Sequence, residues 1–154
     1  MTYHHDRRDA LKWGAALPVT LGLGTLLSKE AQAFEKNAFE AKTWADALKA
    51  LGLAAPMESK DVVLNCPDIA ENGAVVPIAA SCALPGVKKI LFFVEKNPSP
   101  LVAIFNVSED VLANFSTRTK MSQTSDVMAV VVMQDSKALV SRKEIKVTLG
   151  GCGG

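Results

Sequence analysis

Histidine is nearly missing from this 154-residue sequence, because its two histidines, His4 and His5, both lie near the N-terminus. Residues 34–154 contain none. This part of the chain therefore cannot form Ser-His or Cys-His nucleophilic pairs, histidine metal sites or a histidine acid–base catalyst. The sequence also lacks a Cys-x-x-Cys-His motif and a glycine-rich phosphate loop after a strand, which excludes covalent haem and that type of nucleotide site. We expect a protein that is not an enzyme, with no catalytic residue, metal or cofactor of its own.

An excess of charge of either sign is missing too. The chain has 17 Lys and Arg and 16 Asp and Glu, and its first 33 residues hold four and three of these. Residues 34–154 therefore carry 13 of each and have no net charge. A neutral chain argues against nucleic acid or an anionic membrane as its partner.

The first 33 residues have the organisation of an export signal. Residues 6–12, Asp-Arg-Arg-Asp-Ala-Leu-Lys, resemble the twin-arginine signature, and the apolar run at 13–27 is too short and glycine-rich for a transmembrane span. Ala31-Gln32-Ala33 fits the small-x-small pattern of a signal-peptidase site. We expect a cleaved signal over residues 1–33 and export of the folded chain to the periplasm. An N-terminal membrane anchor is the alternative.

Residues 34–149 have the length and pattern of one mainly β domain. Apolar residues, Trp44 among them, recur at helical spacing from Asn37 to Leu51, and Gly52 supplies a stop, so we expect one short amphipathic helix. Seven segments rich in Val, Ile, Phe and Thr follow, separated by turn residues. These predicted strands cover residues 60–66, 74–81, 87–95, 101–107, 113–121, 126–133 and 139–149. Their number and spacing favour an immunoglobulin-like antiparallel β-sandwich.

Two segments allow more than one interpretation. Residues 127–133 are almost continuously apolar, which fits a central strand buried on both faces or a strand buried against another subunit; we favour the central strand. The Asn97-Pro98-Ser99-Pro100 loop is either a rigid hairpin connection or a partner contact. The apolar strands also lead us to expect self-association of the isolated chain.

The most unusual stretch is the last six residues, in which one cysteine lies between two pairs of glycines. They are Leu149, Gly150, Gly151, Cys152, Gly153 and Gly154. Glycine has no Cβ and wide conformational freedom, so residues 150–154 are predicted to form a narrow, mobile arm. Fully extended, three residues place Cys152 about 10 Å beyond Leu149, where it can enter the pockets of other molecules. The simpler interpretation is an incidental thiol in a disordered terminus.

The other two cysteines, Cys66 and Cys82, lie 16 residues apart on neighbouring predicted strands. In an oxidising periplasm they could form a disulfide, which we favour slightly over two buried thiols. Such a bond would contribute roughly 3 kcal/mol in the chain-entropy model. Cys152 would then be left over, as a free thiol or as the site of an intermolecular bond.

Several stretches of the chain resemble the SoxY family, the carrier subunits of the bacterial thiosulfate-oxidising Sox system. They are Glu71–Pro77 (ENGAVVP), Asn97–Ala103 (NPSPLVA), Ser116–Met121 (STRTKM) and Lys146–Gly154 (KVTLGGCGG). The resemblance runs from the signal to the last residue, and the Gly-Gly-Cys-Gly-Gly ending is its most specific part.

The resemblance implies a covalent carrier that pairs with SoxZ, a second small β-sandwich protein. Thiosulfate would be joined to Cys152 by the c-type cytochrome SoxXA, and SoxB would then hydrolyse the adduct to release sulfate. The cation closest to Cys152 in the sequence is Lys146, six residues away. Because nothing in the tail lowers the pKa of the thiol, we expect the partner enzymes to activate it.

Two other functions share features with this sequence. A ubiquitin-like sulfur carrier also ends in Gly-Gly, but it needs ATP and a helix in the middle of a β-grasp fold, whereas the helix predicted here precedes the strands. A structural immunoglobulin-like module would use Cys152 for an intermolecular disulfide and would carry no sulfur adduct.

Overall fold

The computed structural model describes residues 35–149. The export signal predicted over residues 1–33 and the arm predicted over residues 150–154 lie outside that range, so both stay predictions. Within it, no helix is long and apolar enough to cross a membrane. The same residues contain no group of three or more His, Cys, Asp or Glu side chains that could hold a metal ion.

Nine strands follow one another in the described part of the chain. They are β1 (Met57–Glu58), β2 (Val62–Asn65), β3 (Ile69–Ala70), β4 (Val76–Cys82), β5 (Val87–Val94), β6 (Leu101–Asn106), β7 (Asn114–Thr119), β8 (Ser125–Met133) and β9 (Ala138–Val147). The seven longer strands match the seven predicted segments to within two residues at each end. The two-residue strands β1 and β3 were not predicted, because so short a segment shows no alternation in the sequence.

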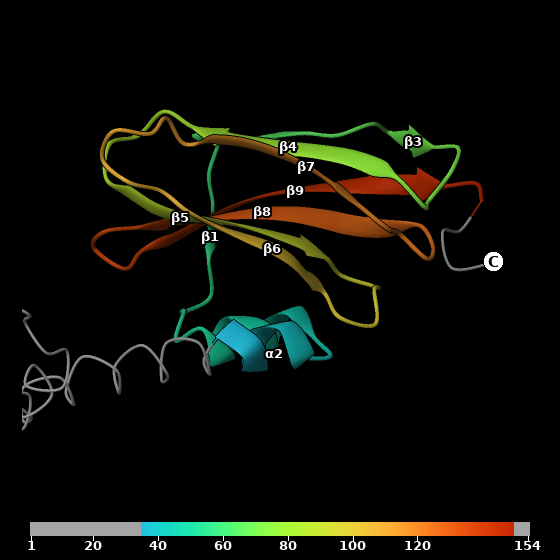
Figure 1. Ribbon diagram of the computed structural model, residues 1–154, viewed down its shortest axis with the longest axis horizontal. Helices are drawn as coiled ribbons and strands as arrows, with labels where there is room; N and C mark the ends of the chain where they lie inside the picture. The colour runs from blue at the N-terminus through green and yellow to red at the C-terminus, as the bar shows by residue number, and fades with distance from the viewer. Residues whose placement is uncertain (1–34, 150–154) are drawn as a thin grey trace, which may run out of the picture. The chain divides into compact units, whose positions relative to one another are not determined.

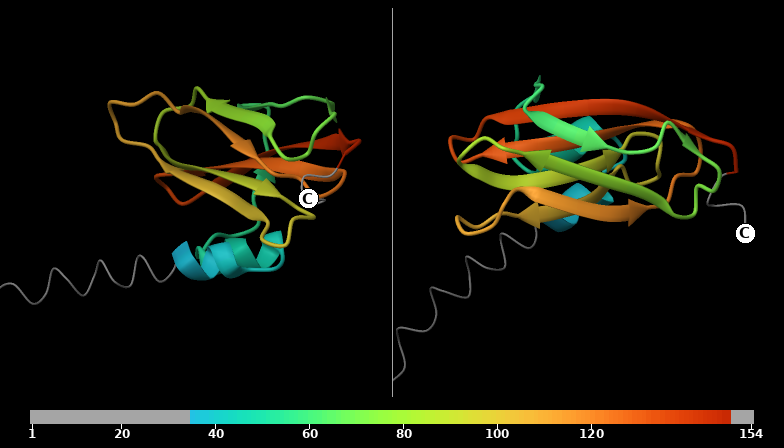
Figure 2. Two further views of the ribbon diagram at one scale, coloured as in Figure 1. Left: turned by 45° about the vertical axis from the view of Figure 1, so that its right-hand side comes forward. Right: turned by 90° about the horizontal axis from the view of Figure 1, so that it is seen from above.

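The strands form two sheets that face each other, as Figures 1 and 2 show. One has the order β2-β4-β7, and the other has the order β1-β9-β8-β5-β6 with β3 also paired to β9. All pairs are antiparallel except β1 and β3, which run parallel to β9. Strands β2, β4 and β7 occupy the places of A, B and E in an immunoglobulin domain, and β5, β8 and β9 those of C, F and G. The predicted immunoglobulin-like sandwich is confirmed.

The space between the sheets is filled by the inward residues of both. Val76, Ile78, Phe92, Val127 and Ile145 are at most 1% exposed. Between the edge strands β6 and β7, the Phe105 ring stacks on the Phe115 ring with 4.8 Å between centroids. It also meets the Phe92 ring edge-on at 5.9 Å. Because these rings come from β5, β6 and β7, they join the two sheets where no backbone pairing does.

Strand β8 is the central strand, buried on both faces, that residues 127–133 predict. Val127, Ala129 and Val131 point into the space between the sheets, while Met128 and Val130 belong to a second apolar cluster on the opposite face. The N-terminal segment covers this second face with residues that include Ala47 and Leu48. Figure 1 shows its helical turns beneath β5 and β6.

The single helix predicted over residues 37–51 is wrong in one respect, because the segment is broken. Residues 35–40 are helical, and α2 (Trp44–Ala50) begins anew after Thr43. The Thr43 side chain accepts a hydrogen bond from the Asp46 backbone N–H at 3.1 Å, an N-cap that starts a second helix. The helical spacing of apolar residues continues across this break, so the sequence pattern did not reveal it. Gly52, at φ +67°, ends α2 as predicted.

Candidate functional site: the root of the C-terminal arm

The end of β9 is held by a set of hydrogen bonds to backbone carbonyls. The Thr148 N–H donates to the Ala70 carbonyl at 3.1 Å, and its hydroxyl donates to the Glu71 carbonyl at 3.0 Å. The Gly73 N–H donates to the Leu149 carbonyl at 2.7 Å. We call Thr148, Leu149 and the 70–73 loop the arm root. It fixes the last described residue of the chain immediately before the predicted arm.

Two neighbouring loops are bonded to the arm root. The Met121 N–H donates to the Gly73 carbonyl at 2.7 Å. The Asn97 side chain donates to the Lys120 carbonyl at 2.7 Å and accepts from the Ser122 N–H at 3.4 Å. The segments for which the sequence resembles SoxY therefore meet at one end of the sandwich, although the residues that bond across them are up to 77 positions apart in the sequence. Figure 2 shows the loops gathered at the end where β9 finishes.

The fold also brings cations toward the arm root that sequence reasoning missed. Arg118 and Lys120 lie on and just after β7, and both are exposed. They are more than 30 residues from Cys152 in the sequence, so counting charges along the tail could not find them. Through Met121 and Gly73, however, β7 ends close to Leu149.

Cys66 and Cys82 are free thiols, so the disulfide favoured from the sequence is wrong. In the β2–β4 ladder Cys82 pairs with Val62, whereas Cys66 follows Asn65, which pairs with Ala79. Four residues of strand separate the two levels, or about 13 Å. A disulfide needs Cα atoms within about 7 Å of each other. Strand pairing in this register places the two cysteines at different ends of the ladder, which sequence separation could not show.

Neither of these thiols is activated for chemistry. Cys82 is 6% exposed and packs in the core. Cys66 is half-buried, and burial raises the pKa of its thiol more than the nearby Lys143 ammonium lowers it. Lys143 is itself engaged, since its Nζ donates to the Cys66 carbonyl at 3.0 Å and pairs with Asp68 at 2.9 Å. A raised pKa means less thiolate at neutral pH and a slower nucleophile.

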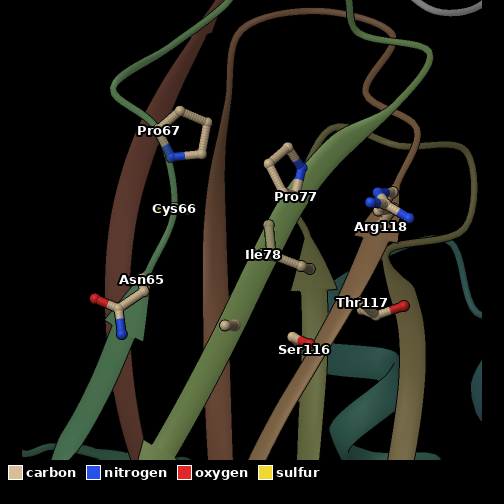
Figure 3. Close-up of a pocket in the computed structure, with 9 residues that line it drawn as sticks. Asn65, Cys66, Pro67, Pro77, Ile78, Ser116, Thr117 and Arg118 are labelled. Carbon is tan, nitrogen blue, oxygen red and sulfur yellow. The ribbon is translucent and has the colours of Figure 1, made fainter.

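A groove of about 750 Å³ opens where β2 leaves the three-stranded sheet. Cys66 and Pro67 form one wall, Pro77 of β4 lies opposite, and Ser116 and Arg118 of β7 form the far side. Figure 3 shows the two proline rings on either side of the gap and Arg118 at the end of β7. We call this the outer groove.

Comparison with known proteins identifies the family. The model of the family described as sulfur oxidation protein SoxY matches residues 48–152. The chain belongs to the SoxY family. A solved structure of the sulfur carrier protein SoxY from Chlorobium limicola f thiosulfatophilum is 34% identical, with a TM-score of 0.62 over 70% of this chain and 97% of that one. No curated protein matches.

More distant matches are to superoxide reductases. That of Ignicoccus hospitalis is 13% identical, with a TM-score of 0.47 over 56% of this chain and 78% of that one. That of Nanoarchaeum equitans is 9% identical, with a TM-score of 0.47 over 59% and 99%.

Proposed function

We propose that this protein carries sulfur intermediates covalently on Cys152 during thiosulfate oxidation. The observation that carries the proposal is the arm root, which fastens Leu149 to the sandwich three residues before Cys152. The family and the SoxY relative described as a sulfur carrier support it. A firmly held root lets the arm residues alone enter a partner enzyme, while the sandwich stays outside. Glycines on both sides of Cys152 keep that arm narrow, since any Cβ would widen it.

Loading is an oxidation that joins the sulfane sulfur of thiosulfate to the Cys152 sulfur. Cys–SH and S₂O₃²⁻ give Cys–S–S–SO₃⁻, one proton and two electrons, and a c-type cytochrome of the SoxXA type takes the electrons. Hydrolysis by a SoxB-type enzyme then breaks the bond between the terminal sulfane sulfur and the sulfonate. Cys–S–S–SO₃⁻ and water give Cys–S–S⁻, sulfate and two protons. The carrier keeps the sulfane sulfur for later steps.

In this scheme the chain presents the bound sulfur intermediate, and its partner enzymes catalyse the loading and the hydrolysis. The two thiols of the sandwich do not compete, because one is in the core and the pKa of the other is raised by burial. We further propose a SoxZ-type subunit as the stable partner and the periplasm as the compartment, reached through the signal at residues 1–33. Both extend the family assignment.

The test is reconstitution of the carrier with SoxZ, SoxXA and SoxB proteins and thiosulfate, with released sulfate as the readout. Cys152→Ser should abolish sulfate release. Cys66→Ser, the matched control, should retain at least half of it, because that thiol packs beside the core and burial raises its pKa. Equal activity of Cys152→Ser and the unmodified chain would refute the attachment site.

A further inference from the structure

The loop of the arm root contains the pair Asn72-Gly73, the only Asn-Gly sequence in the chain. In such a pair the backbone nitrogen of the glycine can attack the side-chain amide carbon of the asparagine, because glycine has no Cβ to hinder the approach. Asn72 is exposed, so water can reach its side chain, whereas Gly73 is buried. The sequence and the exposure together make Asn72 a candidate for spontaneous deamidation.

The structure prepares the electrophile of this reaction, which is the side-chain amide of Asn72. Its Oδ1 accepts a hydrogen bond from the Ala74 backbone N–H at 2.8 Å, which closes a turn that encloses the Gly73 nitrogen. A hydrogen bond to this oxygen withdraws electron density from the amide carbon and stabilises the negative charge that attack would place on the oxygen. The amide is thus held near the attacking nitrogen and polarised toward it.

The nucleophile, in contrast, is engaged by the arm root. The Gly73 N–H donates to the Leu149 carbonyl at 2.7 Å. Attack requires this nitrogen to lose its proton and to turn toward Asn72, and the bond to Leu149 opposes both. The Gly73 carbonyl is held as well, by the Met121 N–H at 2.7 Å, so both peptide units of this glycine are fixed. The reaction therefore waits for the arm root to open.

We propose that Asn72 is a self-modification site, that the arm root gates its deamidation, and that the product unfastens the root. The Gly73 nitrogen bonds to the side-chain carbonyl carbon of Asn72, the bond from that carbon to the amide nitrogen breaks, and ammonia leaves with the proton of the Gly73 N–H. The cyclic succinimide then takes up one water and opens to aspartate or isoaspartate. The steps need no oxidant or reductant, and the inference does not depend on carriage by Cys152.

The isoaspartate product changes the main chain itself. It routes the chain through the former side chain and so adds one methylene between residues 72 and 73. Gly73 cannot then keep its bonds to both Leu149 and Met121 in register. A negative charge also replaces a neutral amide directly beside Glu71. Each opening of the root thus carries a chance of permanent loosening, and chains whose root opens often accumulate the change.

The reaction is measured on the purified full-length chain in mildly alkaline buffer. Mass spectrometry of the peptide that contains residue 72 follows conversion of the amide to the acid, and labelling by an isoaspartyl methyltransferase distinguishes isoaspartate from aspartate. The same chain unfolded in guanidinium chloride gives the ungated rate. We expect the folded chain to react at least about tenfold more slowly, which corresponds to an opening that costs about 1.4 kcal/mol or more.

Two substitutions at Thr148 open the root to different degrees. Thr148→Val removes the hydroxyl that donates to the Glu71 carbonyl and should speed the folded-state reaction about twofold. Thr148→Pro also removes the N–H that donates to the Ala70 carbonyl and should speed it roughly fivefold or more. The matched control is Thr43→Val, which removes the N-cap hydrogen bond of α2 and should leave the rate unchanged.

Equal rates for the folded and the unfolded chain would overturn the gating. So would equal acceleration by Thr148→Val and Thr43→Val, since the reaction would then follow overall stability and not the arm root. An unfolded chain without product at residue 72 would overturn the site. If isoaspartate forms while hydrogen exchange at the Met121 N–H stays as slow as in the unmodified chain, the product does not unfasten the root.

Discussion

At the scale of single residues, the three cysteines have separate environments. Cys82 is part of the core, Cys66 is half-buried beside the Lys143–Asp68 ion pair, and Cys152 belongs to the predicted arm. The sulfur of Cys66 behaves mainly as a small apolar group, because desolvation is the largest influence on its pKa. Its titration should therefore affect folding and leave carriage unaffected.

The pKa of the Cys66 thiol is higher in the folded chain than its ordinary value of 9.0. Its contribution to stability is fully present below that pH and is lost as pH rises through the folded pKa, because the unfolded chain releases the proton first. We expect the free energy of unfolding to fall more between about pH 8 and 10 in the unmodified chain than in Cys66→Ala. Urea titrations at both pH values measure this, and parallel losses would contradict it.

At the scale of elements, the outer face of the large sheet depends on the N-terminal segment for its cover. Lys89 of β5 pairs with Glu35 at 3.2 Å, and the Arg142 guanidinium of β9 lies 5.6 Å from the Trp44 ring centroid. These contacts are at the margins of an apolar interface that contains Leu91. The cover is thus held mainly by burial of apolar area.

Leu91→Ala should lower the free energy of unfolding by about 2–5 kcal/mol, because Leu91 is fully buried between β5 and the helical cover. The matched control is Leu112→Ala, since Leu112 is 87% exposed and should change stability by less than about 0.5 kcal/mol. Chemical denaturation compares the two. Similar values would mean that the N-terminal segment does not pack on this face.

The arm root allows a smaller test. Thr148→Val keeps the β-branched shape but removes the hydroxyl that donates to the Glu71 carbonyl. We expect a loss of about 0.5 kcal/mol, at the low end for a hydrogen bond because Thr148 is exposed. Hydrogen exchange at the Gly73 N–H, which bonds to Leu149, should also become faster. Unchanged exchange would show that the root does not depend on this contact.

At the scale of the whole molecule, much of the sandwich follows from local patterns and the functional end does not. Alternation and turn residues located all seven longer strands, and the apolar run at 127–133 identified the central strand. The break at Thr43, the separation of Cys66 from Cys82, and the connection of Met121 to Leu149 through Gly73 depend on capping, register and crossing connections. The first is a local capping effect, and the other two are long-range contacts. The periodicity of apolar residues does not encode either kind of interaction.

Removal of residues 150–154 should leave the sandwich intact, because the described core and both sheets are complete by Leu149. The free energy of unfolding should change by less than about 0.5 kcal/mol, and sulfate release in the reconstituted system should stop. Circular dichroism with urea titration checks the first expectation. A destabilised truncation would give the tail a structural role and make its loss of activity uninformative about carriage.

The central claim is that the sulfur intermediates are bound covalently to Cys152, and peptide mass spectrometry tests it most directly. The protein is isolated from cells grown with thiosulfate, digested, and its C-terminal peptide is weighed before and after reduction. The account predicts thiosulfonate and sulfane adducts on Cys152 that a reductant removes, with none on Cys66 or Cys82. A bare Cys152, or one found only as a disulfide-linked dimer, would contradict the account and favour a structural use of the tail.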